Sequence, residues 1–295
     1  MKFLLVLLCL TAGQALRRSG VLGPGSHLGI NAWLVYVAVP AAALLYVPRI
    51  EWDLNMVWPV LMPILIWVGA WLVLGRVAPK DDPGTRGALF LGCGLGNTSF
   101  VGFPIVLTYH GEPGLQVAVV CDQVSFLLLS TLGVATSIAH GSGDRQRGVL
   151  AGLVRFPPFL AFAAALLFPG VVSYGALPEL WEPLAATLVP VALFSVGIQL
   201  EVSAKAFDRT LGWGLLYKLA LGPALVLAML WFGGASGLVA KVTLLEASMA
   251  AMATTSVLAV QYGLNTRISN LLIGVGVPLS LLTSHLWWRL GEMLF

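Results

Sequence analysis

The feature that most constrains this chain is a succession of apolar segments. Each is about the length that a helix needs to cross the roughly 30 Å hydrocarbon core of a membrane. Only short polar connections separate them. The sequence therefore predicts an all-α membrane protein with ten transmembrane helices, near residues 2–16, 28–47, 55–76, 86–109, 115–138, 149–168, 181–200, 210–231, 239–262 and 268–290.

Composition supports a membrane protein and argues against several other classes. Hydrophobic residues make up 58% of the 295 residues and charged residues only 10%, whereas a soluble domain carries roughly a quarter charged residues. There is no glycine-rich phosphate loop, no Ser-His-Asp arrangement and no long basic tract, so we expect neither an enzyme nor a nucleic-acid-binding protein. The three cysteines show no CxxC spacing, and we expect no cofactor apart from a coupling ion.

Positive charge is distributed unevenly between the two sides of the predicted helices. The connections after the odd-numbered helices carry about ten Lys and Arg residues, among them Arg17, Arg18 and Lys80, and the other side carries four. By the positive-inside rule the richer side is cytoplasmic. We therefore expect a multi-pass protein of the inner cell membrane with both termini outside. A cleaved signal peptide at residues 1–15 is the alternative for the first segment.

The two halves of the chain echo each other. Val39-Pro40-Ala41-Ala42 in the second predicted helix matches Val189-Pro190-Val191-Ala192 in the seventh, and Asn97-Thr98-Ser99-Phe100 in the fourth matches Thr254-Thr255-Ser256-Val257 in the ninth. Each half contains five crossings, which is an odd number, so the second half must enter the membrane from the opposite side. This predicts two inverted five-helix repeats, residues 1–140 and 149–295, which is the usual build of secondary transporters.

The fourth predicted helix contains the strongest sign of a break. Four glycines and Pro104 lie within residues 92–104 and weaken a continuous helix. Backbone groups that are freed at membrane depth must be satisfied by protein or by water in a cavity. Asn97, Thr98 and Ser99 lie at this point, so we predict a polar site there. A break in the ninth helix, which lacks Gly and Pro over residues 246–256, is inferred from the repeat alone.

Charged residues inside the apolar segments are the remaining candidates. Asp122 has Ser125 one turn further along its face, and Glu246 lies about seven residues inside the ninth segment. A carboxylate at that depth is costly unless it is paired, solvated or neutralised. Asp122 and Glu246 could bind sodium with Asn97 and Ser125, or take up a proton. Lys218 either snorkels to an interface or meets an anionic substrate. The histidines, including His27 and His110, are interpreted as loop or interfacial residues.

The residues of the fourth helix also resemble a known family. Asn97-Thr98-Ser99-Phe100-Val101-Gly102-Phe103-Pro104, followed by Gly111-Glu112-Pro113-Gly114-Leu115, is similar to the signature of the auxin efflux carrier family, with Ser99 in place of the usual glycine. That family is related to the bile acid:sodium symporters. Leu245-Glu246-Ala247-Ser248-Met249 resembles the Leu-Glu-x-x-Met of those symporters, whose Glu ligates sodium, and the likeness extends that role to Glu246 and, more weakly, to Asn97 and Thr98.

The resemblance implies a ten-helix carrier of organic anions. Helices 1, 2, 6 and 7 would form a scaffold, helices 3–5 and 8–10 a moving transport domain, and the broken helices 4 and 9 would cross at the site. A homodimer is implied by the family alone. The predicted substrate site comprises Asn97, Thr98, Ser99, Pro104, Asp122, Ser125, Met249 and Thr255, and the predicted sodium ligands are Glu246, Asn97, Thr98 and Ser125.

Two alternatives stay open at this point. One is a cation or proton antiporter on the same fold that uses Asp122 and Glu246 without an organic substrate. The other is an intramembrane enzyme or sensor, for which the sequence offers neither a catalytic constellation nor a soluble effector domain.

Overall fold

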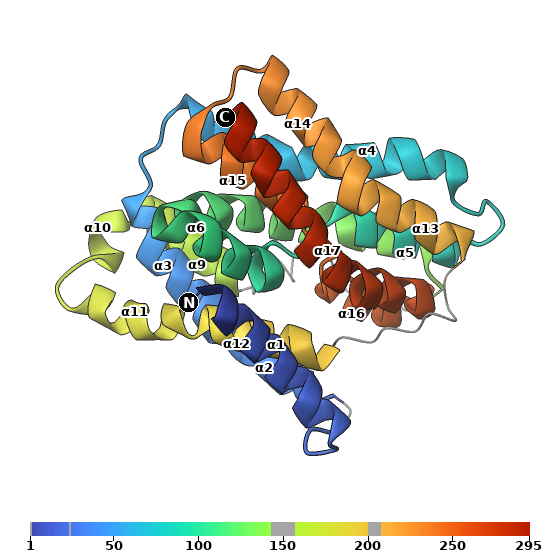
Figure 1. The fold of residues 1–295 in the computed structure, drawn as a ribbon, viewed down its shortest axis with the longest axis horizontal. Coiled ribbons are helices and arrows are strands. Elements are labelled where there is room, and N and C mark those ends of the chain that lie inside the picture. The colour runs from blue at the N-terminus through green and yellow to red at the C-terminus, as the bar shows by residue number, and fades with distance from the viewer. Residues whose placement is uncertain (1, 24, 143–156, 200–207) are drawn as a thin grey trace.

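Helices make up the fold, in keeping with the apolar segments of the sequence (Figure 1). The computed structural model describes residues 2–23, 25–142, 157–199 and 208–295. Within those ranges the α-helices are α1 (Lys2–Arg18), α2 (Ser26–Trp33), α3 (Val39–Tyr46), α4 (Val57–Val77), α5 (Pro83–Gly94), α6 (Phe103–Leu128), α7 (Val134–His140), α9 (Pro157–Leu167), α10 (Pro169–Val172), α11 (Leu177–Ala186), α12 (Leu188–Gln199), α13 (Arg209–Leu216), α14 (Gly222–Phe232), α15 (Gly237–Ala247), α16 (Thr254–Tyr262) and α17 (Thr266–Leu294).

Several of these helices continue through a single wide π-helical turn. Such turns join α2 to α3, α6 to α7 and α13 to α14, at η1 (Leu34–Ala38), η5 (Leu129–Gly133) and η7 (Tyr217–Leu221). A fourth, η4 (Thr98–Gly102), leads into α6. Because a π-turn inserts a residue into the helical register, it frequently marks a functional position.

Six helical segments of the described chain are long and apolar enough to cross a membrane. They confirm a multi-pass α-helical membrane protein and account for six of the ten predicted crossings. One of them, Thr98–His140, has 43 residues and would measure about 65 Å as a straight helix, twice the thickness of the hydrocarbon core. Gly111 has a φ of 70° and breaks this helix, because only glycine adopts that conformation without steric cost.

The other four predicted crossings coincide with shorter or interrupted helices. α1 has 17 residues, α9 has 11, and the fourth and ninth predicted helices are each divided into two pieces. Residues 149–156 of the sixth predicted helix lie outside the described part of the chain.

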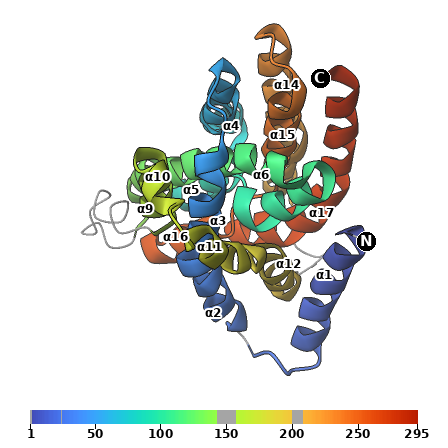
Figure 2. The same ribbon diagram turned by 90° about the vertical axis from the view of Figure 1, so that its left-hand side faces the viewer.

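The helices gather into two groups that touch along α6. α1, α2, α3, α9, α11 and α12 pack with one another, whereas α4, α5, α13, α14, α15 and α17 form the other group with α6 (Figures 1 and 2). α1 and α12 come very close. A Cβ added to Gly197 would lie 2.3 Å from the carbonyl oxygen of Leu10, and one added to Gly13 would lie 2.3 Å from that of Phe194. Small residues permit this backbone contact, as in other membrane helix pairs.

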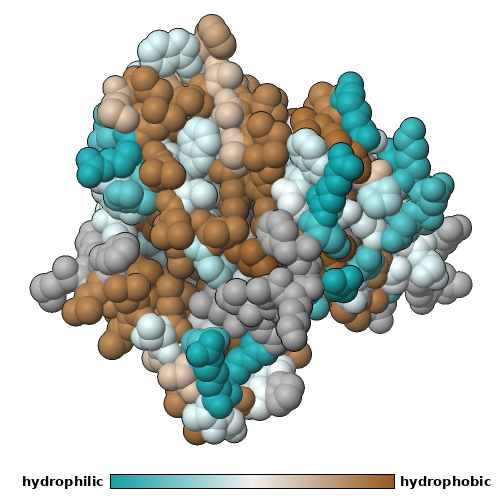
Figure 3. Space-filling model, turned by 45° about the vertical axis from the view of Figure 1, so that its right-hand side comes forward, coloured by the Kyte–Doolittle hydropathy of each residue, from teal (hydrophilic) through white to brown (hydrophobic). Residues whose placement is uncertain are grey.

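Apolar side chains cover much of the outer surface. Figure 3 shows hydrophobic residues over the middle of one face and hydrophilic residues gathered towards its edges. Leu4, Phe232, Val260 and Leu282 are each at least two-thirds exposed. Such a surface suits contact with lipid hydrocarbon.

Candidate functional site

Two interrupted helices meet in the middle of the molecule. The segment between α5 and η4 runs antiparallel to the segment between α15 and α16, with Gly96 opposite Ala251. The amide of Asn97 donates to the carbonyl of Ala250 over 2.8 Å, and the amide of Met252 donates to the carbonyl of Leu95 over 3.0 Å. Each break therefore satisfies backbone groups of the other, as burial at membrane depth requires.

Local chemistry accounts for the first break. α5 ends at Gly94, Leu95 is extended, and the Asn97 side chain accepts a hydrogen bond from the Phe100 amide over 3.2 Å. Asn97 is thus the N-cap of the second half of this helix, a role for which Asn is well suited. Pro104, two residues into α6, needs no amide partner there.

The second break lacks a comparable signal in its own sequence. α15 stops at Ala247, and the Ser248 hydroxyl donates to the Leu245 carbonyl over 2.6 Å. The Thr255 hydroxyl donates to the Met252 carbonyl over 2.7 Å at the start of α16. The first bond satisfies a carbonyl in the last turn of α15, and the second bonds a carbonyl just before α16.

Three charged side chains are buried beside the crossing. Asp122 on α6, Lys218 in η7 and Glu246 on α15 are exposed by 0%, 2% and 1%. Lys218 therefore does not snorkel to an interface. The Thr98 hydroxyl donates to Asp122 over 2.6 Å and the Gln123 amide donates to it over 3.4 Å. A carboxylate buried this deeply needs such partners, because its desolvation is costly.

Glu246 is the less satisfied of the two acids. Neither of its carboxylate oxygens has a hydrogen-bond partner within the described chain. The carboxylate lies directly against η4, where a Cβ added to Gly102 would be 2.2 Å and 2.6 Å from its two oxygens. Only glycine at position 102 leaves room for it.

A small cavity adjoins Glu246. Its volume is about 10 Å³, and Thr98, Ser125, Lys218 and Glu246 are among the residues that line it. That is about the space of one water molecule. Thr98, Ser125 and Glu246 offer hydroxyl and carboxylate oxygens, which are hard donors of the kind that a small cation prefers, whereas the ammonium of Lys218 in the same wall opposes a second positive charge. The described residues contain no cluster of three or more His, Cys, Asp or Glu that could hold a metal.

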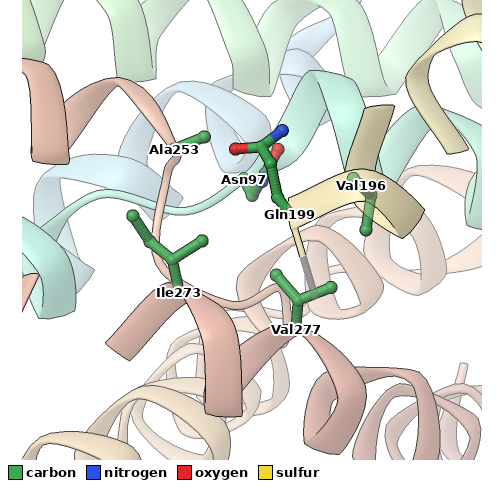
Figure 4. Close-up of a pocket in the computed structure, with 6 residues that line it drawn as sticks. All are labelled: Asn97, Val196, Gln199, Ala253, Ile273 and Val277. Atoms are coloured by element: carbon green, nitrogen blue, oxygen red, sulfur yellow. The ribbon is translucent and has the colours of Figure 1, made fainter. Parts of the chain in front are cut away.

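Asn97 faces a different cavity. It lines a space of about 10 Å³ together with Gln199 at the end of α12, Ala253, and the α17 residues Ile273 and Val277. Figure 4 shows Asn97 and Gln199 among the residues that line this space, together with Ile273 and Val277 of α17. The structure thus divides the predicted sodium ligands: Thr98, Ser125 and Glu246 share one cavity, whereas Asn97 points to the other side of the crossing.

A larger polar cavity adjoins the one at Asn97, with Gln199 and Ile273 in the walls of both. Its volume is about 320 Å³, within the range of small-molecule sites. Arg17 and His27 contribute from α1 and α2, and Ser256 and Asn270 from α16 and α17. The Arg17 guanidinium also donates to the Ile198 carbonyl over 2.6 Å, which fixes it at the wall.

This cavity contains residues that sequence reasoning missed. Arg17 served only to orient the helices, and His27 was placed in a loop, whereas the structure puts it in α2. His110 was also expected in a loop, but it lies in α6 with its Nδ1 atom 3.9 Å from a Glu292 oxygen. No spacing pattern links Arg17, His27, Gln199 and Asn270, because each comes from the end of a different helix.

The other predicted residues are buried near the crossing. Ser99, Pro104, Met249 and Thr255 are all buried. Ser125 donates to the Cys121 carbonyl over 2.8 Å, and the Met249 amide donates to the Glu246 carbonyl over 3.2 Å. Neither Pro104 nor Met249 is among the residues that line the two cavities at the crossing.

Comparison with known proteins identifies the general class. Residues 1–144 match the model of a family described as membrane transport protein. The protein is a membrane transport protein. This match confirms the resemblance to the auxin efflux carrier type and agrees with the absence of any catalytic motif in the sequence. The Pro104 motif and the α5–α6 break both fall within the matched half.

Two archaeal transporters are similar over nearly the whole length. The transport protein is 27% identical over 298 residues to an uncharacterized transporter of Methanocaldococcus jannaschii, with 96% of each chain covered. It is 28% identical over 293 residues to an uncharacterized transporter of Methanothermobacter thermautotrophicus, with 96% of this chain and 95% of that one covered. The similarity therefore extends through the second half, which contains Glu246.

Proposed function

We propose that the protein is a secondary active transporter of small organic anions that works by alternating access around the α5–α6 and α15–α16 crossing. The observation that carries the proposal is the antiparallel pairing of the two breaks next to a polar cavity that both helix groups line. Discontinuous helices that meet inside the membrane form substrate and ion sites in many secondary transporters.

The substrate class is inferred from the cavity wall. Arg17 contributes a fixed positive charge, and Asn97, Gln199, Ser256 and Asn270 contribute amide and hydroxyl groups in the cavity or in the one beside it. The positive charge of Arg17, which keeps its bond to the Ile198 carbonyl, favours an anionic ligand in this cavity. A carboxylate is therefore the group that we propose for the substrate.

The described helices can be grouped into the ten predicted crossings. The first half would comprise α1, α2–α3, α4, α5 with the start of α6, and the rest of α6 with α7. The second would comprise α9, α11–α12, α13–α14, α15–α16 and α17. In this proposal residues 1–140 and 149–295 are inverted repeats, helices 1, 2, 6 and 7 form a scaffold, and the remaining helices move as a transport domain.

The proposed coupling site is the small cavity at Glu246. Either sodium, held by Glu246, Thr98 and Ser125, or a proton on a carboxylate would neutralise a charge that otherwise lies buried without a hydrogen-bond partner. Asp122, which already accepts a hydrogen bond from Thr98, would respond to the same event. Binding of sodium or a proton at this cavity would thus be linked, through Thr98, to the broken helix that also contains Asn97.

A cation or proton antiporter is the second candidate function. It is favoured by the two buried carboxylates, Asp122 and Glu246, and needs no organic substrate. We further propose that the protein lies in the inner cell membrane with both termini outside, and that it forms a homodimer through the scaffold helices.

Thermal stability of the purified protein tests this function. Dicarboxylates, indole acids and bile acids are added singly, with and without sodium, because a ligand of the native state raises the unfolding temperature through mass action. The proposal predicts that at least one anion stabilises the protein, and that a sodium effect is lost in Glu246→Gln but kept in Glu292→Gln, at an exposed ion pair. Stabilisation by sodium or low pH alone, with no anion effect, would favour the antiporter.

A further inference from the structure

A further cavity, apart from the three described above, is apolar and begins at the first turns of α6. It is formed between α1, the first turns of α6 and the middle of α17, and its volume is about 310 Å³. Leu7 and Leu10 contribute from α1, Ile105 and Tyr109 from α6, and Leu281 and Leu282 from α17. We call this space the α1–α17 groove.

The polar groups of the groove already have partners. The Thr108 hydroxyl donates to the Pro104 carbonyl over 2.7 Å, and the Ser284 hydroxyl donates to the Leu281 carbonyl over 3.4 Å. The Tyr109 hydroxyl lies 2.9 Å from Nδ1 of His285. A polar ligand would find few unmet hydrogen bonds here, so the groove favours an apolar occupant.

The groove is continuous with the lipid-facing surface. Leu7 in its wall is 47% exposed and Leu282 is 70% exposed, and their neighbours Leu8 and Leu286 are 62% and 67% exposed. In a membrane-spanning protein such side chains contact hydrocarbon. Since protein interiors leave few voids of this size, the hydrocarbon beside the groove is available to fill it.

One end of the groove has the features of a membrane interface. Tyr109 stacks on Trp288 with ring centroids 4.3 Å apart, and the Arg289 guanidinium lies 5.7 Å from the centroid of the Trp288 ring. Tyr and Trp are enriched at the level of lipid headgroups, and Arg binds phosphate through paired hydrogen bonds. These three residues place a cation and an aromatic pair one to two helical turns from Leu281 and Ser284.

We propose that the α1–α17 groove binds one acyl chain of a membrane phospholipid, with the phosphate of its headgroup at Arg289. With both termini outside, as proposed above, Arg289 near the C-terminus places this lipid in the outer leaflet. The binding itself does not depend on that orientation. Because α1 and α17 belong to different helix groups, the bound lipid bridges the proposed scaffold and transport domain.

Native mass spectrometry of the purified full chain tests the proposal. Phosphatidylglycerol or phosphatidylethanolamine is titrated into delipidated protein, and the fraction with one lipid bound is measured. Leu7→Trp and Leu281→Phe enlarge a side chain in two opposite walls of the groove. Leu8→Trp is the matched control, because Leu8 is exposed on α1 but does not line the groove. Each buried methylene of the acyl chain contributes about fourfold to the lipid affinity. A larger side chain that displaces two methylenes should therefore lower this affinity about 15-fold.

The expected result is one tightly bound lipid in the wild type and in Leu8→Trp, and about 15-fold weaker binding in both groove variants. Arg289→Gln is expected to weaken binding of both lipids, and glycerol 3-phosphate, which lacks acyl chains, is expected not to bind. Equal binding by Leu8→Trp and the two groove variants would overturn the proposal, as would binding of glycerol 3-phosphate. If Leu7→Trp does not fold, Leu281→Phe still tests the groove. A protein that binds the lipid but transports no anion would count only against the proposed function.

Discussion

The contact between Gly102 and Glu246 leads to a sharp prediction. In Gly102→Ala the new Cβ would lie 2.2 Å and 2.6 Å from the two oxygens of the Glu246 carboxylate, far inside van der Waals contact. The carboxylate must therefore move into the adjoining cavity of about 10 Å³. Overpacking of this kind costs about 1–3 kcal/mol, which corresponds to a fall in Tm of about 2–10 °C for a chain of this size.

A double-mutant cycle isolates this contact. Thermal unfolding in detergent is measured for the wild type, Gly102→Ala, Glu246→Ala and the double variant. Because Glu246→Ala removes the clashing carboxylate, we expect Gly102→Ala to cost almost nothing in that background, and the difference between the two backgrounds is the energy of the contact. An equal loss of Tm in both backgrounds would refute the reasoning, since it would place the cost of Gly102→Ala elsewhere.

Three further predictions concern other parts of the molecule. Asp82 accepts hydrogen bonds from the Thr85 amide and hydroxyl, which lower its pKa. The Asp82 carboxylate therefore stabilises the fold above its unfolded-state pKa, and this stabilisation is lost as pH falls through the folded-state pKa. Asp82→Ala should lower the free energy of unfolding by about 0.5–1 kcal/mol at neutral pH and by less at pH 3, as Tm measured at the two pH values would show. Gly197→Ala should lower Tm by several degrees because the added Cβ would meet the Leu10 backbone, whereas Gly170→Ala meets nothing within 4 Å and should leave Tm unchanged. Arg17→Gln should weaken anion binding about 10- to 150-fold relative to Arg49→Gln, and it should lower Tm as well because it removes the bond to the Ile198 carbonyl. Unchanged anion binding would remove Arg17 from the site.

The sequence predicted the helices better than the grouping of the site residues. Apolar length alone placed the segments, and the glycines before Pro104 marked the first break. The break after Ala247 could be found only through the internal repeat, because no Gly or Pro marks it. Its cause lies in tertiary structure: Met252 and Ala250 bond to the other break.

The orientation of side chains around a broken helix could not be predicted from spacing. Asn97 and Thr98 are adjacent in sequence, yet they line different cavities, because the turn of η4 begins between them. Arg17 and His27 could not be assigned to a cavity either, since they share it with Asn270 of α17, which is distant from both in the sequence. Such a site is a property of helix ends that meet in space.

Uptake of radiolabelled organic anions into proteoliposomes tests the central claim most directly. Dicarboxylates, indole acids and bile acids are supplied to vesicles that contain the wild type, Asn97→Ala, or Gly170→Ala as the matched control. We predict saturable uptake of at least one anion by the wild type and the control, and its loss in Asn97→Ala with the fold intact. Uptake that is unchanged in Asn97→Ala, or proton or sodium flux without uptake of any anion, would contradict an organic-anion carrier built around this crossing.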